Sequence, residues 1–413
     1  MPAAMTPAMP PARPVVRFLD RSTPPHIVTL VLVTGLSALT MTVFLPSLPG
    51  MTAWFQTDYR LMQLSVSLYL GMSAVLQIVI GPVSDRYGRR PVLLWSMVIF
   101  LVATLGTLLA PDATSFLVFR MVQAVVAAGM VLGRAAVRDM VPDEEAASMI
   151  GYVTMGMALV PMIGPMIGGV LDEAFGWQAN FALLLGLGIA VFWLVWADLG
   201  ETAAPGRRGF GAQLRQYPDL LSSPRFWGYS LAAAFSSGSF FAYLGGAPYV
   251  GTEVYHLSPA VLGVCFAAPS VGYAFGNYVS GRFSTRIGMN RMVLGGTCIT
   301  ATGLGLLLML ELAGLGGAVT FFGLITTVGL GNGMALPNAN AGMLSVRPEL
   351  AGTASGLGGA IMIGGGAGLS AVAGWALGFG GGALPLVALM FASATLAVSM
   401  ILMVIRRTRR LAL

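Results

Sequence analysis

The chain has 413 residues, of which 56% are hydrophobic and only 9% are charged. Soluble proteins carry about 25% charged residues, so this composition excludes an ordinary soluble enzyme, and it excludes a disordered chain as well. The mean hydropathy of +0.81 and the long apolar runs indicate a polytopic helical membrane protein and not an outer-membrane barrel. The net charge of +6 comes from arginines without any lysine, and their clustering between apolar runs favours membrane orientation over nucleic-acid binding.

Twelve apolar stretches are long enough to cross a membrane, since one span needs about 20 apolar residues. We therefore predict an all-α membrane protein with twelve transmembrane helices. Their expected limits are 27–48, 61–80, 92–110, 116–137, 148–170, 180–199, 226–247, 260–280, 292–312, 317–342, 352–375 and 384–405. Residues 1–25 lack an apolar core with a cleavage site, which favours a flexible cytoplasmic tail over a signal peptide.

The arginines fall almost entirely on one side of these spans. With both termini in the cytoplasm, all of the 22 basic residues except Arg60 and Arg120 lie in cytoplasmic segments or at the cytoplasmic ends of spans. This asymmetry predicts that orientation. The longest internal loop lies at the midpoint of the chain. We predict a six-helix half over 26–199, a cytoplasmic linker over 200–225, a second six-helix half over 226–405 and a basic cytoplasmic tail over 406–413.

A short pattern that follows the second predicted span returns after the eighth, displaced by 200 residues. It consists of Gly81, Ser84, Arg86 and Gly88, which recur as Gly281, Ser284, Arg286 and Gly288. Such an internal repeat of two six-helix halves is typical of transporters that rock two halves around a site near the membrane midplane. A channel or a receptor does not require it.

The first copy of this pattern belongs to the segment 81–90, GPVSDRYGRR. Its glycines permit a tight turn, and its aspartate can cap a helix or pair with an arginine. The alternative is a plain positively charged turn. We assign to gating between the inward-open and outward-open states Gly81, Asp85, Arg86, Gly88, Arg89 and Arg90.

The segment 81–90 resembles the signature loop of the major facilitator superfamily nearly residue for residue. Arg120 with Gln123 resembles the fourth-helix arginine motif of its drug:proton antiporters. Gly164, Pro165 and Gly168 resemble their fifth-helix antiporter motif, in which small residues allow close helix approach and proline can bend the helix. The resemblance therefore implies a gating role for these three residues.

Shorter phrases at 45–49, 138–139 and 176–178 resemble the Bcr/CflA branch of that superfamily, and 241–249 resembles an offshoot with importers of riboflavin and of copper as well as drug exporters. The resemblance covers about residues 27–405. It implies the major facilitator fold, a multi-pass protein of the bacterial inner membrane and a monomer.

One position departs from that branch. Its first span commonly carries an acidic residue shortly before the Leu45-Pro46 pair, where this chain has Thr42. No other carboxylate falls clearly at the midplane of a predicted span, and carboxylates within the membrane are the usual proton relays. The departure puts the common proton-coupling scheme in doubt.

The resemblance also implies a central cavity, and we searched its expected spans for polar or aromatic residues at helical spacing. The substrate-binding candidates are Tyr69, Arg120, Gln123, Phe240, Tyr243, Tyr273, Asn277, Asn332 and Asn340. The alternative role for each is packing and hydrogen bonding between helices. A site that is aromatic, rich in amides and nearly free of carboxylates suits a neutral, planar solute better than an organic cation.

The sequence offers no nucleophile–base pair, phosphate-binding loop or metal cluster, so we expect neither an enzyme nor a bound cofactor. We expect a secondary transporter whose partners are a small solute and the lipid bilayer. The main hypothesis is uptake of a riboflavin-type vitamin, and the alternative is multidrug efflux by drug:proton antiport. Copper import is a minor alternative, because Met155, Met162 and Met166 share one face of a predicted span and thioethers suit Cu(I).

Overall fold

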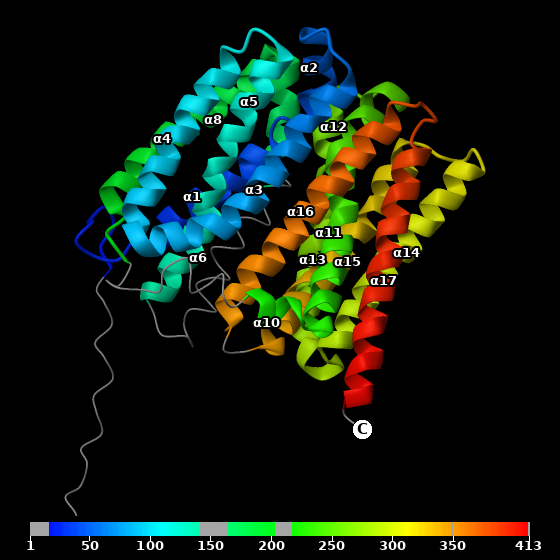
Figure 1. The fold of residues 1–413 in the computed structure, drawn as a ribbon. Coiled ribbons are helices and arrows are strands. Elements are labelled where there is room, and N and C mark those ends of the chain that lie inside the picture. The colour runs from blue at the N-terminus through cyan, green and yellow to red at the C-terminus, as the bar shows by residue number, and fades with distance from the viewer. Residues whose placement is uncertain (1–15, 141–159, 161–162, 203–216, 348–349, 412–413) are drawn as a thin grey trace, which may run out of the picture.

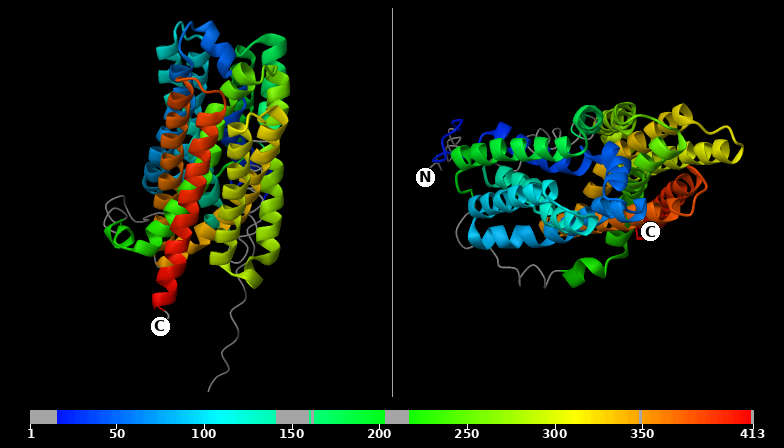
Figure 2. Two further views of the ribbon diagram at one scale, coloured as in Figure 1. Left: turned by 90° about the vertical axis from the view of Figure 1, so that its right-hand side faces the viewer. Right: turned by 90° about the horizontal axis from the view of Figure 1, so that it is seen from above.

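The structure is a computed structural model that describes residues 16–140, 160, 163–202, 217–347 and 350–411. All regular elements within these ranges are helices, and they form one elongated bundle (Figure 1). This confirms the predicted all-α class. Figure 2 shows the same bundle from its side and from above. In the view from above, the helices of the first half lie mostly to one side and those of the second half mostly to the other.

The described part of the first half consists of α1 (Ile27–Thr42), η1 (Leu45–Ser47), α2 (Leu48–Trp54), α3 (Tyr59–Tyr87), α4 (Arg89–Leu108), α5 (Ala113–Gln123), η2 (Ala124–Ala127), α6 (Ala128–Met140), a helix over 163–175 and α8 (Gln178–Asp198). The second half consists of α10 (Tyr217–Leu221), α11 (Pro224–Tyr249), η3 (Val250–Val254), α12 (Pro259–Cys265), α13 (Ala267–Ile287), α14 (Met289–Leu312), α15 (Ala318–Val346), α16 (Ala351–Leu377) and α17 (Leu384–Leu411).

Ten helical segments of the described chain are long and apolar enough to cross a membrane. Two of the twelve predicted spans are not among these ten. The fifth, 148–170, lies mostly outside the described residues. The seventh is present as α11, a helix of 26 residues rich in glycine and serine. Because α11 packs against α15, α16 and α17, it contacts protein on several sides and needs less hydrophobic surface than a lipid-facing helix.

The observed helices differ from the predicted spans mainly at their ends and at internal breaks. The first span is interrupted after α1 and continues as η1 and α2, because Pro46 and Pro49 each occupy the first turn of a new helix. The fourth and eighth spans likewise consist of shorter helices in series. Elsewhere α3 and α15 run past the predicted limits, since polar turns continue a helix after its apolar core has ended.

Side-chain caps fix several helix starts at one end of the bundle. Asp58 accepts a hydrogen bond from the Arg60 N–H at 2.9 Å and caps α3. Asp112 accepts from the Ser115 N–H at 2.9 Å and caps α5, and this bond lowers the pKa of its carboxyl group. Arg60, which we expected in the first outer loop, therefore lies in the first turn of α3.

Both ends of the described chain lie at the other end of the bundle, where α1 begins and α17 stops (Figure 1). We call this the terminal end, and the opposite end the far end. Between the two ends, large apolar side chains cover the outside of the bundle. Trp95 is 68% exposed, Val102 64% and Leu109 72%. Apolar exposure on this scale fits a surface in contact with lipid rather than water.

Candidate functional site

The turn between α3 and α4 carries the signature segment at the terminal end. Gly88 joins the two helices with φ 97° and ψ 151°, and Gly288 joins α13 to α14 with φ 90° and ψ 144°. Residues with a side chain rarely adopt a φ in this range. The repeat predicted from the sequence therefore returns as the same backbone turn in both halves.

Arg89 organises the signature turn. It is only 5% exposed, pairs with Asp85 at 2.6 Å and with Asp139 at 3.2 Å, and donates a hydrogen bond to Ser84. Asp85 thus pairs with an arginine, one of the two roles we considered, whereas Glu201 caps the next helix. The Glu201 carboxylate accepts from the Arg89 N–H at 2.8 Å, and a carboxylate is favoured at the start of a helix.

The other signature residues are less tightly held. Arg90 donates to the backbone carbonyls of Leu199 and Trp196, which ties the turn to the end of α8. Arg86 is exposed and lies over the Tyr87 ring at 5.3 Å. A Cβ at Gly81 would meet no described atom within 4 Å. The signature turn is therefore anchored within the first half, mainly through Arg89 and Arg90.

Three of the substrate candidates come together inside the first half. Arg120 is 1% exposed and donates to the Thr40 carbonyl at 2.7 Å and to the side chain of Gln123. Gln123 in turn donates to the Thr104 hydroxyl at 2.8 Å. A further bond from Arg120 reaches the carbonyl of Ser65 at 3.4 Å. None of these partners is a carboxylate.

Two aromatic rings complete the surroundings of Arg120. Its guanidinium lies 4.2 Å from the centre of the Tyr69 ring and 4.3 Å from that of Phe44. Tyr69 is a predicted candidate, whereas Phe44 was missed. Its place four residues after Thr40 on the same side of the chain could have indicated it. The cluster joins α1, α3 and α5, and it satisfies a buried cation with rings and carbonyls.

Thr42, the position that departs from the Bcr/CflA pattern, is buried against the helix 163–175. Thr42 is fully buried and donates to the Ala38 carbonyl at 3.2 Å. A Cβ at Gly164 would lie 3.0 Å from the Thr42 hydroxyl, and a Cβ at Gly168 would overlap the Val43 carbonyl. The glycines of the fifth-helix motif therefore let the helix 163–175 lie directly against the end of α1.

The same helix also contacts the second half at the far end. A Cβ at Gly169 would overlap the Pro259 carbonyl oxygen, and a Cβ at Gly263 would overlap that of Pro165. The backbones of the helix 163–175 and α12 thus cross in direct contact. The fifth-helix motif of the sequence includes Gly169 directly after Gly168, and small residues in succession are the usual signal for such crossings. Gly169 was not among the residues assigned to gating.

Polar side chains close the far end between α3 and the second half. Tyr59 donates to the Gly245 carbonyl at 2.9 Å, and its ring lies 5.1 Å from that of Tyr249. Gln63 donates to the Ser370 carbonyl at 2.7 Å. These residues were missed, and the sequence carries little signal for them because their partners are backbone groups more than 180 positions away.

Arg60 contributes a cation–π contact between the two halves at the far end. Its guanidinium lies 4.4 Å from the centre of the Phe379 ring, just after the end of α16. Among the described residues, the hydrogen bonds between the halves join Tyr59 to Gly245, Gln63 to Ser370 and Ala260 to Glu173, all at the far end.

The candidates in the second half do not form one group. Asn332 is 4% exposed and accepts from the Ser236 hydroxyl at 2.7 Å. Asn277 donates to the Tyr273 carbonyl of its own helix at 2.9 Å. Asn340 is exposed, so it does not share the buried surroundings of Asn332.

Tyr243 and Asn338 have surroundings in the second half that differ from those we expected. Tyr243 is fully buried among Phe240, Phe266 and Phe321, so it packs in an aromatic cluster. Asn338, which we did not select, is 5% exposed and donates to the Ser280 hydroxyl at 2.8 Å. It joins α15 to α13. Two methionines of the copper alternative, 155 and 162, lie outside the described residues.

Comparison with known proteins decides the family. The family model described as Major Facilitator Superfamily matches residues 30–371. The chain belongs to the major facilitator superfamily. It is a multi-pass membrane transporter and not an enzyme. The fold agrees: a bacterial homologue of the human lysosomal transporter Spinster, in an inward-facing and occupied conformation, superposes with a TM-score of 0.70 at 17% identity, over 92% of this chain and 96% of that one.

Several relatives of this superfamily member carry names that refer to drug resistance. A chloramphenicol resistance protein of Pseudomonas aeruginosa is 32% identical over 77% of this chain and 76% of its own length. Multidrug resistance protein D of Escherichia coli is 27% identical over 80% and 84%. An uncharacterised transporter of Bacillus subtilis, YdgK, is 32% identical, and the match covers 63% of its length. None of these names refers to riboflavin, so our main substrate hypothesis gains no support and the efflux alternative does.

Proposed function

We propose that the chain exports neutral, drug-sized, hydrogen-bonding compounds from the bacterial cytoplasm by alternating access. The direction of transport is supported by the resistance-related names of the relatives. The chloramphenicol resistance protein also suggests a test compound, since chloramphenicol is an uncharged aromatic amide.

The proposed substrate class follows from the sign of the charges that are buried in the spans. Among the described residues, the charged group buried away from the terminal end is a cation, Arg120, whose partners are carbonyls, an amide and two rings. The side chains of Arg89 and its partner Asp139 are also buried, but they lie at the terminal end, at the signature turn. In the described part of the chain, Asp198 is the carboxylate that is fully buried. It lies at the terminal end and accepts from the backbone N–H groups of Leu19 and His26. A transporter of organic cations would need an acidic group deep in its spans, whereas a neutral solute needs amides and rings.

We place the terminal end in the cytoplasm, because the arginines gather there and positive charge favours that side. The contacts at the far end would then hold the outer side closed while substrate enters from the cytoplasm. The signature turn, with Asp85 and Arg89, would hold the opposite closure in the second half of the cycle. Switching therefore exchanges the contacts of Tyr59 and Gln63 for contacts at the terminal end.

Growth of a drug-hypersensitive bacterium that lacks its own exporters tests this proposal. Expression should raise the minimum inhibitory concentration of chloramphenicol several-fold and leave that of ethidium, an organic cation, unchanged. Asp85→Asn at equal membrane abundance is the inactive control. Equal sensitivity to chloramphenicol with and without the protein would contradict the proposal, and protection against ethidium would contradict the neutral substrate class.

A further inference from the structure

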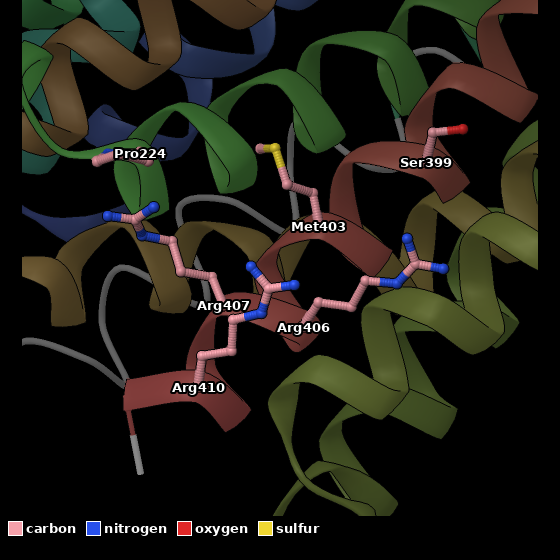
Figure 3. Close-up of a pocket in the computed structure, with 6 residues that line it drawn as sticks. All are labelled: Pro224, Ser399, Met403, Arg406, Arg407 and Arg410. Carbon is pink, nitrogen blue, oxygen red and sulfur yellow. The ribbon is translucent and has the colours of Figure 1, made fainter. Parts of the chain in front are cut away.

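A pocket of about 430 Å³ opens at the terminal end, between the start of α11 and the last turns of α17. Its lining residues are Pro224, Ser399, Met403, Arg406, Arg407 and Arg410. Figure 3 shows the Arg407 guanidinium next to Pro224, that of Arg406 directed away from it, and that of Arg410 between the two. The pocket lies outside the contacts to which we assign transport.

The charge of this pocket is of one sign. Three guanidinium groups line it and no lining residue is acidic. Among the described residues, none of the three arginines has an ion pair or hydrogen-bond partner, unlike Arg89 and Arg120. A guanidinium presents several N–H donors in a planar fork that matches phosphate oxygens. Three unpaired forks around one cavity therefore fit a phosphate group.

The pocket also has an apolar side. Ser399, Met403, Arg407 and Arg410 follow one another at i, i+4, i+8 and i+11, so they lie on one face of α17. Over these residues the helix rises about 16 Å, from a basic end towards the apolar part of the span. Met403 is 40% exposed, and Leu396, about two helical turns further from the basic end, is 45% exposed. A ligand with a phosphate and an apolar tail would follow this stripe along its whole length.

We propose that this pocket binds an anionic phospholipid, with its headgroup phosphate held by Arg406, Arg407 and Arg410 and one acyl chain lying along the α17 stripe. A soluble phosphate would use the guanidinium groups alone and leave the exposed apolar side chains of Met403 and Leu396 uncovered. The proposal rests on the membrane placement of the chain and not on the efflux function. Basic pockets between helices on the cytoplasmic side of a membrane are suited to anionic headgroups.

Lipid retention by the purified full-length protein tests the proposal. The protein in detergent is mixed with phosphatidylglycerol, with phosphatidylcholine or with inorganic phosphate, and bound lipid is counted by native mass spectrometry. We expect phosphatidylglycerol to bind in preference to phosphatidylcholine. The triple variant Arg406→Gln, Arg407→Gln, Arg410→Gln should weaken phosphatidylglycerol binding at least about tenfold, since each arginine near an anionic surface contributes substantially.

Two controls separate this pocket from general surface charge. Arg282→Gln, Arg286→Gln, Arg291→Gln removes the same charge from exposed positions of α13 and α14 and should leave phosphatidylglycerol binding unchanged. An equal loss in both triple variants would overturn the proposal, and so would no loss in the first. Inorganic phosphate that displaces bound phosphatidylglycerol at equal concentration would overturn the lipid assignment, because the stripe would then contribute nothing.

Discussion

The side-chain amide of Gln63 reaches across the molecule to Ser370 and donates to its carbonyl at 2.7 Å and to its hydroxyl at 2.9 Å. The two residues belong to different halves, and Gln63 is fully buried. A Cβ at Gly374 on α16 would overlap the Gln63 side chain, so a glycine makes room for it. A buried amide that loses its hydrogen-bond partners costs free energy, because the group stays out of water without a replacement bond. The contact between Gln63 and Ser370 therefore stabilises the state in which the far end is closed.

Replacing Gln63 by leucine should shift the protein towards states that are open at the far end. Each lost hydrogen bond contributes about 1 kcal/mol, which corresponds to about a fivefold change in the ratio of the two states. Spin labels are attached at Trp54 and Leu315, exposed far-end positions of the two halves. Electron paramagnetic resonance should then show a larger population with a long distance between the two labels. Cys265 and Cys298 are replaced by serine beforehand.

Ser370→Ala provides the matched comparison for Gln63→Leu. It removes the hydroxyl acceptor and keeps the carbonyl, so it should produce a smaller shift in the same direction. The double variant should add little to Gln63→Leu, since both changes act on one contact. Fully additive effects would show that Gln63 and Ser370 do not act through each other.

Alanine at Gly169 or Gly263 should prevent the far end from closing. A Cβ at either position would overlap a backbone carbonyl of the opposite half, and backbone cannot yield as a flexible side chain can. We expect transport to fall strongly while the protein remains in the membrane. Gly186→Ala on α8, where a Cβ meets no described atom within 4 Å, is the control and should transport normally. Normal transport by Gly169→Ala would contradict the direct crossing of the two helices.

Arg120→Lys should lower the thermal stability of the purified protein. A lysine cannot serve the Thr40 carbonyl, the Ser65 carbonyl and Gln123 at once, because its ammonium is a single point without the planar fork of arginine. Each buried acceptor left without a partner costs about 1–3 kcal/mol. The melting temperature in detergent measures the effect. An unchanged melting temperature with abolished transport would instead place Arg120 in direct contact with the substrate.

Asp85→Asn should impair transport more than Arg86→Gln. Asp85 pairs with the buried Arg89, whereas Arg86 is exposed and contacts only the Tyr87 ring among the described residues. Initial export rates at equal membrane abundance compare the two variants. A stronger effect of Arg86→Gln would mean that free positive charge, and not the Asp85–Arg89 pair, is what the signature turn requires.

The helical class, the span positions and the repeat could be predicted from the sequence because hydropathy and glycine turns are local signals. The glycine repeat in the sequence corresponds to a repeat in the structure, since Gly88 and Gly288 both adopt a positive φ in equivalent turns. The far-end closure could not be predicted in this way, since Tyr59 and Gln63 bind backbone carbonyls that leave no trace in the sequence. The sequence also did not distinguish Asn338, which is buried, from the candidate Asn340, which is exposed. Two positions along a helix rotate a side chain by about 200°, so the two residues point to nearly opposite sides.

Transport by respiring inside-out membrane vesicles tests the central claim most directly. In these vesicles the cytoplasmic side faces the medium, so an exporter of neutral solutes should accumulate radiolabelled chloramphenicol and should not accumulate radiolabelled tetraphenylphosphonium, a permanent cation. Asp85→Asn should abolish the accumulation of chloramphenicol. Accumulation of the cation, or of neither compound by vesicles that contain the folded protein, would contradict the account.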